Sequence, residues 1–154
     1  MRILKKNTKD IPINIREAEK EVIKKFRVFD DWIDKYTYII KLGRNLPSMN
    51  LEYKIDENII KGCQLKTWFY SDYKDGRVFY NIDSMSAIIK GISALLIKVL
   101  SGQKPEDIKN ADMNFIDKIG LRGDFSPIRE NSLWKLINQI KSDAALYEKN
   151  KIKI

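Results

Sequence analysis

The sequence predicts a single compact α+β domain in which helices precede and follow a small antiparallel sheet. Three observations support this prediction. Apolar residues recur at three- and four-residue steps on both sides of the middle of the chain, a pattern typical of amphipathic helices. Side chains alternate around Asp75-Gly76, a dipeptide typical of a two-residue hairpin turn. The 154 residues suit one domain, and no internal repeat or linker divides them.

Two helices are expected ahead of the sheet. Asn14 is a candidate N-cap for the first, whose apolar positions recur at helical spacing as far as Phe29. The Asp30-Asp31 pair then predicts a break and a second N-cap. Gly43 is expected to end the second helix as its C′ residue, because glycine readily adopts the left-handed conformation found there.

The middle of the chain predicts a three-stranded antiparallel sheet. The first strand is expected at residues 58–61, just ahead of Gly62 and Cys63. The other two strands form a hairpin in which aromatic and β-branched side chains alternate on either side of Asp75-Gly76. Because both faces of this hairpin carry aromatic residues, we expect at least one face to pack on helices.

Helices are again expected after the sheet. Either Asp83 or Ser84 is a candidate cap for a third helix, which ends at Ser101-Gly102 as many helices do. Within it, Gly91 is small enough to let another element approach closely. Two short helices and one long final helix follow, starting near Pro105, Asn114 and Ser126-Pro127.

Positive charge is concentrated at the two ends of the chain, which carries a formal net charge of +8. Residues 1–28 hold nine basic and four acidic side chains, and residues 148–154 hold three and one. We expect a flexible basic lead-in at residues 1–13, the domain at residues 14–148 and a basic tail at residues 149–154. No nucleic-acid-binding motif accompanies this charge, so nucleic acid is not the expected partner.

Composition narrows the classes of site. One cysteine and no histidine exclude cysteine–histidine hydrolases, the usual zinc and haem sites, and dithiol redox cycling within the chain. We expect no metal and no cofactor of the protein's own. No apolar run reaches the length of about 20 residues that a membrane span requires. The single cysteine and the lack of a signal-peptide pattern predict the reducing cytoplasm, with monomer and homodimer both open.

Cys63 is the candidate reactive residue. A lone cysteine is often a small buried hydrophobe, but Gly62 and Gln64 are poor neighbours in a core and suit an accessible loop. Lys61 and Lys66 place positive charge near the sulfur, which favours thiolate over thiol. A nucleophilic, accessible thiolate is all that attack on a partner's sulfur requires.

Six stretches, in order along the chain, resemble the SufE family of sulfur-acceptor proteins, which includes the CsdE branch. The second stretch contains Gly62-Cys63-Gln64, and the last contains Ser126-Pro127 with Arg129. Together they belong to a match that extends from about residue 20 to residue 146 at compatible spacing. The six stretches are residues 32–47, 60–68, 83–96, 101–105, 115–121 and 126–129.

The resemblance implies a compact α+β fold related to the IscU scaffold, with Cys63 on a surface loop that Gly62 and Gln64 support. It implies that Cys63 accepts sulfane sulfur as a persulfide from a PLP-dependent cysteine desulfurase of the SufS type. The protein would stimulate that enzyme and pass the sulfur to an Fe–S scaffold complex of the SufBCD type. It would thus be a covalent carrier and activator, not an enzyme, and PLP would belong to its partner. Arg129 matches a family arginine linked to the desulfurase contact or to the active loop.

Two departures from the family pattern lie close to these motifs. The family usually has serine where this chain has Leu65, and aspartate where it has Met85. Both positions bear on loop control and partner preference, and neither touches the thiol.

Three alternative functions stay open. The same carrier chemistry could serve tRNA or cofactor thiolation, as in the CsdE branch. A basic module could bind nucleic acid or an acidic partner around a packed Cys63. A cysteine-dependent hydrolase or transferase is disfavoured by the missing histidine.

Overall fold

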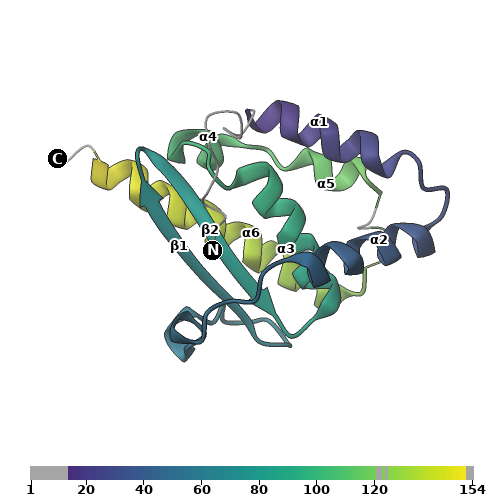
Figure 1. Ribbon diagram of the computed structural model, residues 1–154, viewed down its shortest axis with the longest axis horizontal. Helices are drawn as coiled ribbons and strands as arrows, with labels where there is room; N and C mark the ends of the chain where they lie inside the picture. Colours follow the sequence, from purple (N-terminus) through teal and green to yellow (C-terminus); the bar gives the residue numbers. More distant parts are fainter. Residues whose placement is uncertain (1–13, 121–122, 124, 152–154) are drawn as a thin grey trace.

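The computed structural model describes residues 14–120, 123 and 125–151 (Figure 1). The lead-in predicted at residues 1–13 lies outside the described residues, as do residues 152–154. Within the described residues, six α-helices, two 3-10 helices and one two-stranded antiparallel sheet form an α+β domain, as predicted. In chain order they are α1 (Ile15–Phe26), α2 (Trp32–Asn45), η3 (Leu51–Tyr53), η4 (Asp56–Asn58), β1 (Thr67–Lys74), β2 (Arg77–Ser84), α3 (Ala87–Leu100), α4 (Pro105–Asn110), α5 (Asn114–Lys118) and α6 (Pro127–Lys151).

Local capping signals set where the first two helices begin. The Oδ1 atoms of Asn14 and Asp31 each accept a hydrogen bond from a backbone N–H three residues later, both at 2.9 Å. Both N-cap predictions are confirmed, and caps of this kind each contribute about 1 kcal/mol to helix stability. Helix α1 ends at Phe26, three residues before the expected Phe29, whose ring instead meets that of Phe26 edge-on.

Helices α2 and α3 cross with their backbones in contact. A Cβ atom built on Gly91 would lie 2.1 Å from the carbonyl oxygen of Ile39, and one on Gly43 would lie 2.8 Å from the backbone nitrogen of Gly91. The close approach predicted at Gly91 is therefore confirmed. The prediction that Gly43 ends α2 is wrong, because the helix continues to Asn45 and needs glycine at this position for the crossing.

The sheet has two strands among the described residues, so the prediction of a third strand at residues 58–61 is wrong. Of that segment, Ile59 alone forms an antiparallel bridge, to Trp68, because η4 occupies the residues before it. The hairpin itself is as expected. Asp75 and Gly76, with φ values of 53° and 79°, form its two-residue turn, as a type I′ turn requires.

Strand β2 continues through Ser84, so the predicted helix cap at Asp83 or Ser84 is wrong. The true cap of α3 is Ser86, whose Oγ accepts a hydrogen bond from the Ile89 N–H at 3.2 Å. Beyond its cap, α3 lies between the hairpin and α2 and packs against α6 (Figure 1). No helix in the described ranges is long and apolar enough to cross a bilayer.

Candidate functional site

Cys63 lies on a loop, residues 61–66, whose two ends are held together. The backbone N–H of Ile60 donates to the Thr67 carbonyl at 2.9 Å, and the bridge between Ile59 and Trp68 lies directly below. The base of the loop is therefore part of the sheet's edge, while its tip carries the cysteine. The surface loop that the family resemblance implies is present.

Helix α6 supports the first half of this loop. Gly62 has a φ of +94°, in the region that favours glycine. The side-chain amide of Asn131 donates to the Gly62 carbonyl at 3.2 Å, and a Cβ atom on Gly62 would lie 2.8 Å from Cε of Lys135. The two α6 residues are four apart and share one helix face. The sequence predicted neither contact, because both residues are polar and the expected helix rested on its apolar positions alone.

The second half of the loop is held by the junction between β2 and α3. The backbone N–H of Met85 donates to the Lys66 carbonyl at 2.9 Å, and the hydroxyls of Thr67 and Ser84 lie 2.9 Å apart. Met85 is 64% exposed, and Leu65, next to Lys66, is 46% exposed. The two residues that depart from the family pattern therefore lie on the surface in the segments that flank this contact.

The Cys63 side chain is half-buried at the edge of the hydrophobic core. Its neighbours Lys61, Gly62 and Gln64 are exposed. Cys63 therefore packs against the core without being sealed inside it. In the part of the chain that the structure describes, no three His, Cys, Asp or Glu residues gather into a possible metal site.

Asp83, which pairs with Trp68 in the sheet, is a buried ion-pair centre. Its carboxylate oxygens lie 3.3 Å from Nζ of Lys54 and of Lys90, and one accepts the Ser84 N–H at 2.8 Å. Burial acts to raise the pKa of Asp83, but the Ser84 hydrogen bond and the two lysines outweigh it and hold this pKa below its usual range. Lys54 also lies over the Trp68 ring, at 4.7 Å from its centroid. Asp83 thus fastens the segment before the loop to the sheet.

Arg129 lies in the first turn of α6, whose start is capped by Ser126 through a 3.2 Å hydrogen bond from the Arg129 N–H. Its guanidinium carbon lies 5.8 Å from the ring centroid of Tyr36 and 5.6 Å from that of Phe125. These contacts join α6 to α2. The structure thus places Arg129 against aromatic rings and places Gly62 against a different part of α6.

Comparisons with known proteins agree with this architecture. A family model described as SufE, the Fe-S metabolism associated domain, matches residues 20–144. An uncharacterized SufE-like protein of Rhizobium meliloti is 33% identical over 129 residues, which is 80% of this chain and 92% of that protein. An uncharacterized SufE-like protein of Synechocystis is 29% identical over 128 residues, covering 83% of this chain and 80% of the relative.

A solved structure supports the fold alone. The solution structure of a hypothetical protein from Thermus thermophilus matches with a TM-score of 0.68 at 17% sequence identity, covering 83% of this chain and 93% of that one. The family match includes α2, the Cys63 loop, the hairpin and most of α6. This chain belongs to the SufE family, which is associated with Fe–S metabolism.

Proposed function

We propose that this protein accepts persulfide sulfur on Cys63 from a PLP-dependent cysteine desulfurase of the SufS type and passes it to the Fe–S assembly machinery. By clearing the desulfurase of its persulfide, it also stimulates that enzyme. The observation that carries the proposal is a lone cysteine on a surface loop, closed at its base, in a SufE-family chain without histidine.

The transfer step needs little from the acceptor beyond its sulfur. The Cys63 thiolate attacks the outer sulfur of the donor persulfide, and the new S–S bond forms as the donor's S–S bond breaks. The donor cysteine leaves as thiolate, so the step moves one sulfur atom with no net oxidation. In the second transfer, a thiolate of the recipient scaffold attacks the outer sulfur of the Cys63 persulfide, and Cys63 leaves as thiolate. Neither step calls for a general base, which fits a chain that lacks histidine.

Half-burial of Cys63 suits a carrier that must protect its cargo. An exposed persulfide is open to attack by cellular thiols, because exchange depends on which sulfur can be reached. We expect the loop tip to turn inward in the free protein and outward when the desulfurase binds. The fixed base at Ile60 and Thr67 leaves the tip as the part that moves.

The surface around the loop defines the partner that it fits. Leu65 and Met85 provide exposed apolar area, and the exposed Lys61 and Lys66 of the same loop add positive charge. A complementary partner surface carries an apolar patch with acidic groups at its rim. In this proposal Arg129 is a second contact with the desulfurase, at the end of α6 that begins beside α2.

The experiment mixes the full-length protein with a SufS-type desulfurase, PLP and L-cysteine. We expect the intact mass to increase by one sulfur atom on Cys63, removable by reductant, together with faster release of alanine. Cys63→Ser should fold and accept no sulfur. Sulfur found on this variant would refute the assignment of Cys63.

Alkylation of Cys63 tests the movement of the loop. In the free protein we expect slow reaction with iodoacetamide, and faster reaction when a desulfurase whose own nucleophile has been replaced is added. Equal rates with and without that partner would contradict the inward and outward positions of the loop tip.

A further inference from the structure

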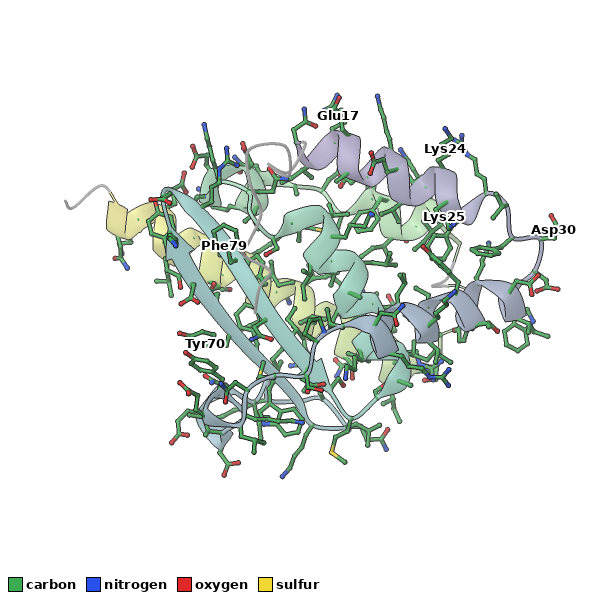
Figure 2. The ribbon with its side chains drawn as sticks, in the orientation of Figure 1. Glu17, Lys24, Lys25, Asp30, Tyr70 and Phe79 are labelled. Carbon is green, nitrogen blue, oxygen red and sulfur yellow. The ribbon has the colours of Figure 1, made fainter. Side chains whose placement is uncertain are left out.

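A cavity of about 290 Å³ lies between η4, β1 and α6, and its lining continues along the chain to Ile60 at the base of the Cys63 loop. Its polar lining comes from all three elements. Figure 2 shows Tyr70 projecting from β1 toward the preceding segment, where its ring stacks on that of Tyr53 at 4.0 Å. The lining residues used below are Glu57, Tyr70, Ser71, Gln139, Asp143 and Tyr147.

The hydroxyl of Ser71 holds the carboxylate of Asp143 at this cavity. The Ser71 hydroxyl donates to Oδ2 of Asp143 at 2.5 Å. The Tyr147 hydroxyl lies 3.0 Å from the Ser71 hydroxyl and donates to the Ser71 carbonyl at 3.2 Å. Asp143 is thus oriented by one neutral donor, the Ser71 hydroxyl from β1, which Tyr147 from α6 holds in turn.

The cavity is negatively charged in a protein that is strongly positive. Glu57 and Asp143 are acidic, and among the described residues no lysine or arginine belongs to the lining. The ion pairs found within the described ranges involve other acids, Asp83 and Glu148. Burial raises the pKa of Asp143, although the Ser71 hydrogen bond acts to lower it. Within the described residues, the Asp143 carboxylate is hydrogen-bonded by Ser71 but belongs to none of these ion pairs.

We propose that this cavity binds a small organic cation, an alkylammonium or alkylguanidinium group, with Asp143 as the anionic anchor. The volume lies just below the roughly 300–1,000 Å³ typical of ligand pockets, so it suits a short alkyl chain with one charged group. Tyr70 and Tyr147 add aromatic rings, which attract organic cations, to the lining, and each ring stacks on one other tyrosine, Tyr53 or Tyr73. Glu57 adds a second negative charge at the cavity wall.

The cavity adjoins the loop that carries Cys63. Asn131, Lys135, Gln139 and Asp143 occur at every fourth position of α6, so each is a neighbour of the next along the helix surface. The first two contact Gly62, and the last two line the cavity. The step from Lys135 to Asp143 is about 12 Å along the helix axis. A cation bound here would lie at the foot of the loop, whether it comes from a free amine or from a basic side chain of a bound protein.

Binding is tested on the full-length protein alone, so the outcome does not depend on the sulfur-acceptor proposal. Amide NMR shifts are followed during titration with n-butylammonium and n-butylguanidinium chloride at constant ionic strength, with n-butylurea as the neutral isostere. We expect saturable shifts at Ser71, Gln139 and Tyr147 for the two cations. Nα-acetylarginine amide and putrescine then distinguish the sources, because tighter binding of the former indicates a protein side chain and of the latter a free amine.

Two variants make the test specific. Asp143→Asn keeps an acceptor for the Ser71 hydroxyl and should fold, but should bind the cations at least tenfold more weakly. Asp75→Asn removes one exposed negative charge at the hairpin turn, where asparagine tolerates the positive φ, and should bind like the wild type. Equal affinity in Asp143→Asn, equal shifts with the urea, or no saturable shift with any cation would overturn the proposal.

Discussion

Replacement of Gly62 by alanine probes how the fold positions Cys63. The φ of +94° at Gly62 costs a non-glycine residue about 1–3 kcal/mol if the backbone stays in place. The new methyl group would also meet Cε of Lys135 at 2.8 Å, but that flexible side chain can move aside. Backbone strain is therefore the larger cost.

Release of the loop from α6 would relieve the backbone strain at residue 62 at a smaller cost in free energy. If the loop leaves α6, the main loss is the hydrogen bond from Asn131 to the Gly62 carbonyl, worth about 0.5–1.5 kcal/mol. This loss is about half the strain that release relieves, so we expect Gly62→Ala to populate a released loop. The base at Ile60 and Thr67 should remain closed, because its hydrogen bond does not involve residue 62.

Alkylation kinetics measure the result. We expect iodoacetamide to modify Cys63 several-fold faster in Gly62→Ala than in the wild type. Gly76→Ala is the matched control, because Gly76 has a φ of +79° but no atom within 4 Å of the added Cβ. It should lower the Tm by roughly 2–4 °C per kcal/mol of strain and leave the alkylation rate unchanged. An unchanged alkylation rate in Gly62→Ala, alongside the expected loss of Tm in Gly76→Ala, would refute the positioning of Cys63 by α6.

Three further predictions concern stability and partner recognition. Asp83→Asn should lose about 1–3 kcal/mol of unfolding free energy at pH 7, measured by urea denaturation. Because the pKa of Asp83 is lowered in the folded protein, the wild type should be the more stable above pH ~4, and this difference should disappear as the pH falls below that. A stability difference that does not change with pH would contradict the ion pairs. Gly91→Ala should lower the Tm by about 6–12 °C, because its Cβ would lie 2.1 Å from the Ile39 carbonyl oxygen. A Tm within about 1–2 °C of the wild type would contradict the close helix crossing. Leu65→Ser combined with Met85→Asp should raise the KM for desulfurase stimulation about tenfold without changing the Tm, and an unchanged KM would remove these residues from the proposed interface.

Predictions that depended on neighbouring residues were confirmed. The caps at Asn14 and Asp31 and the turn at Asp75-Gly76 each involve contacts within three residues. The residues in such contacts are close together in the sequence, so the sequence is enough to predict them. The start of α6 at Ser126-Pro127 follows the same principle.

Predictions failed at residues that suit two structural roles, because contacts with residues distant in the sequence decided which role the residue takes. Gly43 suits a helix end as well as a helix crossing, and only its partner Gly91 selects the crossing. Asp83 suits a cap as well as an ion pair, and Lys54 and Lys90 select the ion pair. Residues 58–61 have a sequence that suits a strand, but η4 ends at Asn58 and leaves too few extended residues for one.

For the site, the sequence alone determined the chemistry: one sulfur nucleophile, no histidine to assist it, and a glycine before it that permits a tight turn. The tertiary structure decided how that sulfur is presented. Asn131 and Lys135 lie about seventy residues beyond Gly62, and the cavity around Asp143 needs three separate elements. Side chains this far apart meet only when α6 packs beside the hairpin, because no local rule connects a loop to a helix formed so much later in the chain.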